Sequence, residues 1–131
     1  MAAMRKLLTG RRILVVEDEM LVLMETEDML ADLGCDAVIA AATNEQAIAL
    51  IEAQHFDAAL LDLNLHGVRS YPVADVLAAR GVPFAFATGY GGSGLRESDR
   101  ERPLLEKPFG SASLETMLVA LLSARSESSP T

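Results

Sequence analysis

Short apolar segments alternate with longer amphipathic segments along the chain. Five segments are apolar at nearly every position: residues 13–16, 37–40, 57–62, 83–88 and 104–106. Such runs are typical of strands that are buried on both faces of a parallel sheet. They predict five strands, and the proline among them, Pro83, stands first in its segment, where no ladder hydrogen bond is lost.

Helical periodicity fills the intervals between these runs. Helices are predicted over residues 20–33, 43–54, 73–80 and 111–124. Gly34 and Gly81 directly follow two of them and act as C-terminal stop signals. Thr43 and Gln46 form a capping-box pattern at the start of another.

This alternation predicts the fold class. Strands separated by helices imply a parallel sheet with helices on both faces, joined by right-handed crossovers. The predicted fold is therefore α/β: a flavodoxin-like, doubly wound, five-stranded parallel sheet in the order 2-1-3-4-5. We divide the chain into an N-terminal arm (1–10), one domain (11–124) and a flexible C-terminal tail (125–131), and expect no attached output module.

Composition narrows the class of partner. The formal net charge of -8 argues against binding to nucleic acid or to anionic membranes. No apolar run approaches the roughly 20 residues of a membrane span, and the N-terminus lacks the pattern of a secretory signal. The single cysteine, Cys35, cannot form an internal disulfide. We therefore expect a cytoplasmic protein.

Carboxylates gather where the first and third strands end. Glu17 and Asp18 follow the first strand directly, and Asp62 ends the third. These strands are neighbours in the predicted order, so their carboxyl ends meet at one edge of the sheet. Carboxylates packed together repel one another, and a hard divalent cation relieves that repulsion. The sequence therefore predicts a Mg²⁺ (or Mn²⁺) site at this edge.

Two more polar residues stand at the neighbouring strand ends. Thr88 ends the fourth strand, and Lys107 follows the fifth and precedes Pro108. A hydroxyl can donate to a phosphoryl oxygen, and a lysine supplies the opposite charge. A carboxylate can attack a phosphoryl group and form an aspartyl phosphate, while a cation offsets the charge of that group. Together these strand ends favour phosphoryl transfer.

Each of these residues also has an ordinary structural interpretation. Asp18 can cap the first helix, and the glutamates beside it can favour the helix dipole. Asp62 can close a turn with Asn64. Thr88 can be a β-branched strand end, and Lys107 a solvated surface lysine. It is the combination at four strand ends that favours the functional interpretation.

The two histidines are expected to be ordinary residues. His55 lies at a helix end, where a partly exposed histidine is common. His66 lies in the loop after Asp62; a catalytic or metal role is the less favoured alternative for it, because no second histidine is placed to join it.

Four motifs stand in order along the chain. They are RILVVEDE at the first strand, ALLDLNL at the third, FATGY at the fourth and LLEKPF at the fifth. Together they resemble the receiver domains of two-component response regulators, over about residues 11–124. The resemblance implies a single-domain response regulator, a phosphoprotein of signal transduction that is not an enzyme beyond its own phosphorylation and dephosphorylation.

The resemblance also implies a role for each residue of the site. The implied roles are phospho-acceptor for Asp62, metal ligands for Asp18 and, through water, Glu17, a metal-ligating backbone carbonyl for Asn64, switch hydroxyl for Thr88, and phosphate-pairing lysine for Lys107. The phosphoryl donor is expected to be a sensor histidine kinase or a histidine phosphotransfer protein. The output partner is an unknown protein, and the expected state is a monomer or a weak homodimer.

One position departs from the family pattern. Receivers usually carry Tyr or Phe three residues before the lysine that corresponds to Lys107. The ring of that aromatic residue turns inward as the switch threonine moves. In this chain the position is occupied by Leu104. The segment PFAFATGYGG resembles instead the FATGY (FAT GUARD) subgroup of stand-alone receivers of alphaproteobacteria. Tyr90 is therefore a candidate switch residue, with an aromatic lid over its loop as the alternative.

The surroundings of Tyr90 suggest how a switch would act. Glycines at 89, 91, 92 and 94 lower the cost of alternative backbone conformations in this loop. Phosphorylation would then favour one of them. We expect partners to bind the surface that the fourth helix, fifth strand and fifth helix form in the receiver fold.

Other functions compete with this interpretation. The domain could serve as a phosphate sink that drains a kinase without an output partner. A haloacid-dehalogenase-type phosphatase also uses a strand-end aspartate and magnesium, but it needs a second aspartate where this chain has Asn64. An inert pseudo-receiver would lack one of the acids, the threonine or the lysine, and all are present here.

Overall fold

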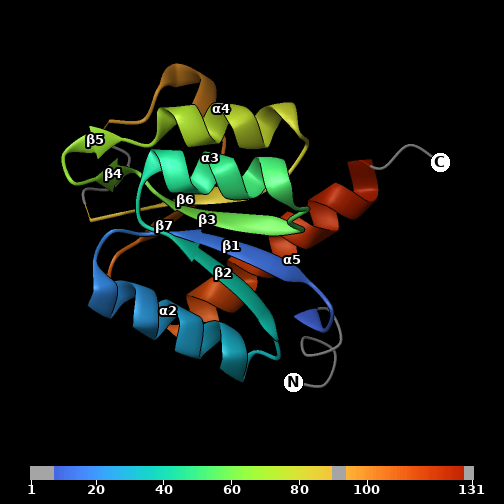
Figure 1. The fold of residues 1–131 in the computed structure, drawn as a ribbon. Coiled ribbons are helices and arrows are strands. Elements are labelled where there is room, and N and C mark those ends of the chain that lie inside the picture. Colours follow the sequence, from blue (N-terminus) through green and yellow to red (C-terminus); the bar gives the residue numbers. More distant parts are fainter. Residues whose placement is uncertain (1–7, 90–93, 129–131) are drawn as a thin grey trace.

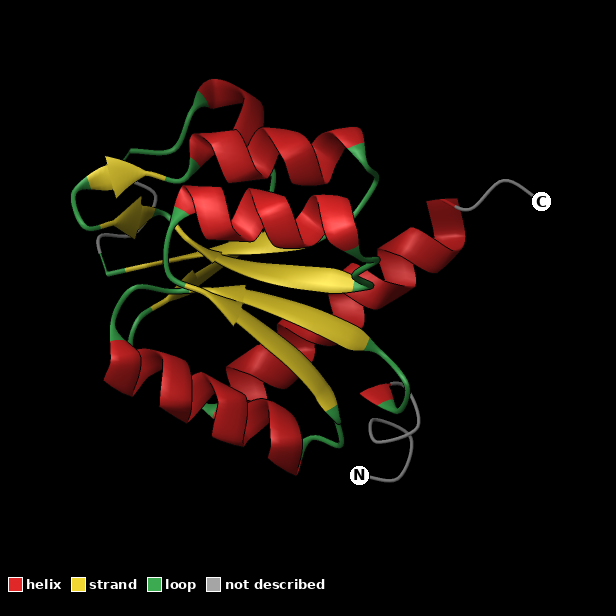
Figure 2. Cartoon of the chain, in the orientation of Figure 1, coloured by secondary structure: helices red, strands yellow, loops and turns green. Residues whose placement is uncertain are grey.

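Five parallel strands form the central sheet of the protein (Figure 1, Figure 2). The computed structural model describes residues 8–89 and 94–128. The strands are β1 (Arg12–Val16), β2 (Ala37–Ala41), β3 (Ala58–Asp62), β6 (Phe84–Thr88) and β7 (Leu104–Glu106). Their order is β2-β1-β3-β6-β7, which confirms the predicted order 2-1-3-4-5.

Helices cover both faces of this sheet. They are α2 (Met20–Asp32), α3 (Asn44–Ala53), α4 (Tyr71–Ala79) and α5 (Ser111–Ser128). Figure 1 shows α2 and α5 on one face and α3 with α4 on the other. Successive side chains along each strand point into two different cores. Ile13 and Val15 of β1 pack with α2 and α5, whereas Leu14 and Val16 pack with α3 and α4. This two-sided burial explains why the strands are apolar at nearly every position before they leave the sheet.

Most helix ends lie near their predicted positions. The side chain of Thr43 accepts a hydrogen bond from the Gln46 N–H at 3.1 Å, which confirms the predicted cap of α3. The predicted start of α4 at Val73 is two residues late, because Pro72 is tolerated in the first turn of a helix. The helix α5 continues to Ser128, past the predicted end at residue 124. None of the helices in the described ranges is long and apolar enough to cross a membrane.

A short hairpin of two strands and a 3-10 turn were not predicted. Strands β4 (Asn64–Leu65) and β5 (Val68–Arg69) form an antiparallel hairpin directly after β3. The other element is η1 (Glu97–Asp99), a 3-10 turn between β6 and β7. Residues 94–103, the described part of that connection, contain no α-helix, because their many charges leave no apolar stripe to bury. The expected partner surface included a helix between β6 and β7. Residues 94–103 do not form that helix, which corrects the expectation.

Candidate functional site

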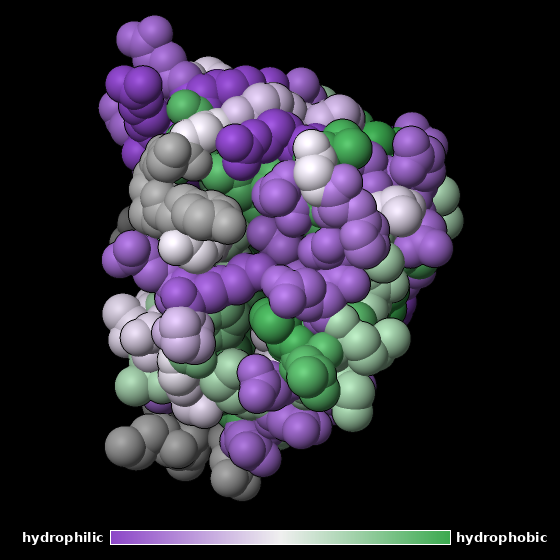
Figure 3. Space-filling view, turned by 90° about the vertical axis from the view of Figure 1, so that its left-hand side faces the viewer, coloured by the Kyte–Doolittle hydropathy of each residue, from purple (hydrophilic) through white to green (hydrophobic). Residues whose placement is uncertain are grey.

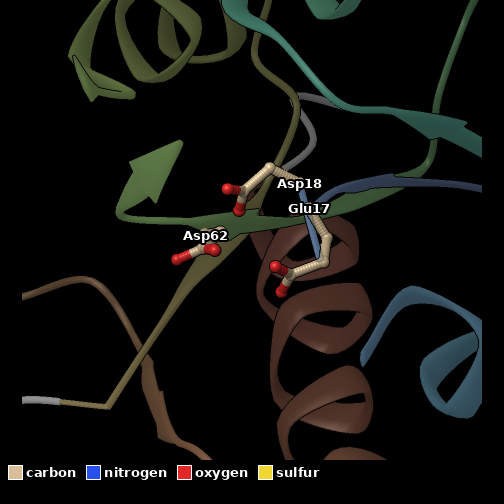
Figure 4. A group of neighbouring side chains, drawn as sticks. All are labelled: Glu17, Asp18 and Asp62. Atoms are coloured by element: carbon tan, nitrogen blue, oxygen red, sulfur yellow. The ribbon is translucent and has the colours of Figure 1, made fainter. Parts of the chain in front are cut away.

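Three carboxylates meet at the carboxyl edge of the sheet. Glu17 and Asp18 follow β1, and Asp62 ends β3, the neighbouring strand. Each offers an oxygen within 4.8 Å of the others, and Figure 4 shows the three groups gathered beyond these strand ends. Glu17 and Asp62 are only 4% and 6% exposed. Burial strengthens their mutual repulsion, so the arrangement fits a bound divalent cation.

Lys107 lies between two of these carboxylates. Its Nζ donates to Glu17 Oε1 at 2.8 Å and to Asp62 Oδ2 at 3.0 Å. The backbone N–H of Lys107 also bonds the Thr88 carbonyl at 2.9 Å, which holds the residue beside β6. Because its side chain is only 16% exposed, the alternative of a solvated surface lysine is wrong. Burial lowers the pKa of Lys107, but its bonds to Glu17 and Asp62 outweigh this and raise the pKa overall.

Glu17 is the most strongly perturbed acid of the cluster. Its pKa is raised to about 7, mainly by burial and further by the neighbouring Asp62. The ammonium of Lys107 and the Glu19 N–H, 3.1 Å from Glu17 Oε2, oppose this rise without cancelling it. When all are ionised, three carboxylates face one ammonium, which leaves a charge of about -2. A hard divalent cation matches both this charge and the all-oxygen donor set.

Asp18 and Asp62 are also tied to the β4–β5 hairpin. Asp62 Oδ1 accepts the Asn64 N–H at 3.2 Å, so the predicted turn between these residues exists beside the site. Asp18 does not cap α2: the N-cap residue is Glu19, without a side-chain cap bond, and Asp18 Oδ2 accepts the His66 N–H at 3.0 Å. The hairpin therefore orients two of the three carboxylates.

Two residues of this region were not predicted to contribute. Ser70 is fully buried, and its Oγ donates to the Asp62 carbonyl at 2.6 Å, which ties the start of α4 to the end of β3. The ring Nδ1 of His66 lies 3.3 Å from Asp18 Oδ2. A two-residue His-Gly loop between short strands is the signal from which this hairpin could have been found.

The site opens into a cavity of about 520 Å³. Its lining includes the predicted residues Asp18, Asp62, Asn64, Thr88 and Lys107. Thr88 is buried at the end of β6, as its place in the sequence predicted. In Figure 3 this edge of the molecule faces the viewer, with hydrophilic residues across the middle and a hydrophobic group just below them. A group the size of a phosphoryl can therefore reach the carboxylates from solvent.

Two further positions bear on the predicted switch: Leu104, where receivers usually carry an aromatic residue, and Tyr90. Leu104 is partly buried on β7, opposite Phe86 of β6, and packs against the core beneath α3 and α4. It is an aliphatic core residue and offers no aromatic ring to the switch. Tyr90 lies outside the described residues.

Solved structures of known proteins are similar to this chain in fold. The solution structure of SdrG from Sphingomonas melonis Fr1 is 44% identical and aligns over 88% of this chain and 98% of its own, with a TM-score of 0.78. The receiver domain of the PhyR response regulator from Erythrobacter litoralis is 33% identical over 92% of this chain and 95% of its own, with a TM-score of 0.77. Among curated protein sequences, none matches the chain.

A third structure bears on the carboxylates. The receiver domain of the sensor histidine kinase PA1611 from Pseudomonas aeruginosa PAO1 holds a magnesium ion in its active-site cleft. It is 31% identical over 86% of this chain and 98% of its own, with a TM-score of 0.74. The sequence also matches the response regulator receiver domain family over residues 13–119. The chain therefore belongs to the receiver domains of two-component response regulators.

Proposed function

We propose that this receiver accepts a phosphoryl group on Asp62 in a Mg²⁺-dependent reaction and thereby switches its binding to other proteins. The observation that carries the proposal is the position of Lys107, whose Nζ bridges Glu17 and Asp62 within a cluster of three carboxylates. The donor would be a phosphohistidine on a sensor kinase or a phosphotransfer protein in the cytoplasm. The unit that does this is the domain 11–124.

Asp62 is prepared to act as the nucleophile. Its carboxylate is oriented by Lys107 at one oxygen and by the Asn64 N–H at the other. A carboxylate oxygen forms a bond to phosphorus while the bond from phosphorus to the donor's imidazole nitrogen breaks. Lys107 then faces the new phosphoryl charge, and the Thr88 hydroxyl donates to a phosphoryl oxygen.

The metal would be held by Asp18, by Asp62, by the backbone carbonyl of Asn64 and, through water, by Glu17. A bound Mg²⁺ supplies positive charge to the phosphoryl oxygens during transfer. Asp18 is kept in place for this role by the His66 N–H. The three carboxylates can share one ion because their oxygens lie within 4.8 Å of one another.

The first experiment is intact-mass measurement after incubation with Mg²⁺ and a small-molecule phosphodonor. The wild type should gain one phosphoryl group, and Asp62→Asn should gain none. Asp75→Asn is the matched control, since Asp75 is 65% exposed and lies outside the site. The gain should disappear when a chelator removes the metal. Equal modification of the wild type and Asp62→Asn would contradict the proposal.

We assign the chain to the FATGY subgroup and Tyr90 to its switch. The support is the segment PFAFATGYGG together with Leu104, an aliphatic residue where the family usually has an aromatic one. Tyr90→Ala should weaken the response of partner binding to phosphorylation, whereas Tyr90→Phe should retain it. Normal phosphorylation and normal partner affinity in Tyr90→Ala would refute this assignment.

A role as a phosphate sink shares the chemistry but needs no output partner. The two roles differ in one measurement: only the switch requires a partner whose affinity for the domain changes on phosphorylation. Small-molecule phosphatase activity is disfavoured, because Asn64 stands where such enzymes place a second aspartate. Steady turnover of a phosphoester would overturn that view.

A further inference from the structure

The turn of the β4–β5 hairpin places a histidine beside the carboxylates. His66 and Gly67 form its two-residue loop, with φ values of 52° and 82°. Positive φ at both loop positions is typical of a type I′ turn, in which Asn-Gly is the most favoured pair. His66 is the only non-glycine residue with positive φ in the described ranges. A histidine therefore occupies a position that asparagine would fill with less strain.

The hairpin aims this histidine at Asp18. The His66 N–H donates to Asp18 Oδ2 at 3.0 Å, and the ring Nδ1 lies 3.3 Å from the same oxygen. One backbone contact and one ring contact thus place the imidazole of His66 beside the carboxylate of Asp18. The ring is 72% exposed and lines the same cavity as Asp18 and Asp62, so an ion can approach it from solvent.

We propose that His66 and Asp18 make this edge of the receiver a zinc-binding site. The inference rests on the metal site of the proposed function and adds a nitrogen ligand to it. Two ligands at about 2.1 Å from one ion lie roughly 3 Å apart, which is close to the separation seen here. Imidazole together with carboxylate favours Zn²⁺, whereas oxygen ligands alone favour Mg²⁺. Zinc held here would occupy the place that the phosphorylation site needs for magnesium.

The chain contains a comparable pair that serves as a control. His55 Nε2 lies 3.5 Å from Asp57 Oδ1, at the start of β3, on the opposite edge of the sheet. Asp57 already accepts the Arg12 N–H at 2.8 Å and pairs with the Arg11 guanidinium at 3.6 Å. Its charge is therefore met by a cation, and no further carboxylate joins it among the described residues. A histidine beside a carboxylate should not hold zinc in this setting.

The test compares zinc and magnesium affinity by isothermal titration calorimetry in three proteins. His66→Asn removes the imidazole but suits the positive φ, so the turn and its N–H bond to Asp18 are kept. We expect His66→Asn to weaken Zn²⁺ binding by about tenfold or more and to change Mg²⁺ affinity by less than about twofold. His55→Asn should bind both ions as the wild type does. On addition of Zn²⁺, the imidazole nitrogen resonances of His66 should shift, and those of His55 should not.

Two outcomes would overturn the inference. One is a His66→Asn variant that binds Zn²⁺ as tightly as the wild type, and the other is an equal loss of affinity for both ions. Correct folding of the variant is checked by its backbone amide spectrum. Failure of this inference can be told apart from failure of the proposed function, since Mg²⁺-dependent phosphorylation of Asp62 is measured without zinc and can succeed while zinc binding fails.

Discussion

Two clusters of charged side chains in this receiver each place one cation between two carboxylates, yet they differ in balance. In the acidic site, Lys107 bridges Glu17 and Asp62, and Asp18 adds a third carboxylate. The second group, which we call the anchor cluster, consists of Asp75, Arg96, Asp99 and Arg102. Its two guanidinium groups match its two carboxylates, so its net charge is zero, whereas the acidic site has an excess of about two negative charges when its three carboxylates are ionised.

The anchor cluster has a structural task. Arg96 bonds Asp75 Oδ1 at 2.8 Å and Asp99 Oδ2 at 2.8 Å, and its guanidinium lies 4.5 Å from the centre of the Tyr71 ring. These contacts hold the segment around η1 against α4, and the described residues 94–103 contain no α-helix that could pack there instead. The balanced cluster ties elements together, whereas the uncompensated charge of the acidic site fits a metal cation.

Replacing Lys107 or Arg96 by an uncharged residue should distinguish the role of the acidic site in phosphorylation from the role of the anchor cluster in stability. Lys107→Met should slow phosphorylation by about 10²-fold or more, because the charge that faces the phosphoryl group is lost. Arg96→Met should leave the rate within about twofold of the wild type but lower the free energy of unfolding. Both are measured by intact mass against time and by urea denaturation. A slow rate in Arg96→Met would show that the clusters are not separate.

The acidic site should also make stability depend on pH. The pKa of Glu17 is about 7 in the fold, above its ordinary value of 4.5, mainly because the group is buried. Between these values the unfolded chain loses the proton and the folded chain keeps it. Stability is therefore full below the lower value and falls as the pH rises to about 7, by at most about 3 kcal/mol.

Urea denaturation in a chelator, from about pH 5 to about pH 8, checks this dependence. Glu17→Gln cannot ionise and should lose less stability over that range. Added Mg²⁺ should reduce the loss in the wild type, since the ion favours the charged carboxylate. A wild type that gains stability through this window would contradict the assigned shift.

The buried acid of the anchor cluster should matter only for stability. The side chain of Asp99 is 5% exposed and faces both Arg96 and Arg102. Asp99→Asn keeps the size of the side chain but removes its charge, which should cost about 2 kcal/mol in the free energy of unfolding. Phosphorylation by a small-molecule donor should be unchanged. A change in that rate without a change in stability would give this cluster a functional task.

The residues that meet at the edge of the sheet could be predicted from the sequence because strand ends are recognisable. A strand buried on both faces is apolar until it leaves the sheet. Asp62 therefore stands out as the last residue of β3, and Thr88 as the last residue of β6. Parallel order then brings distant ends together, as with Lys107 and Glu17, which are 90 residues apart yet share a 2.8 Å bond. Local pattern and global order agree at these positions.

The elements that were missed depend on information that periodicity does not carry. The strands of the β4–β5 hairpin have two residues each, too few to show an alternating pattern. Asp75 and Arg96 are 21 residues apart on segments of unrelated type, and their pairing follows only from the packed fold. The order of strands could thus be predicted, whereas the absence of an α-helix from the described residues 94–103 could not.

The smallest expected effect concerns the outer acid of the anchor cluster. The hydrogen bonds from Arg96 lower the pKa of Asp75, so its contribution to stability is present at neutral pH and is lost as the pH falls through the folded value. Because the side chain is 65% exposed, water screens the pair, and Asp75→Asn should cost no more than about 0.5 kcal/mol at neutral pH. Urea denaturation of Asp75→Asn and of Asp99→Asn under the same conditions compares how much each carboxylate that pairs with Arg96 contributes to the free energy of unfolding. Equal losses would mean that burial does not set the strength of these pairs, and the contrast between the two clusters would then rest on net charge alone.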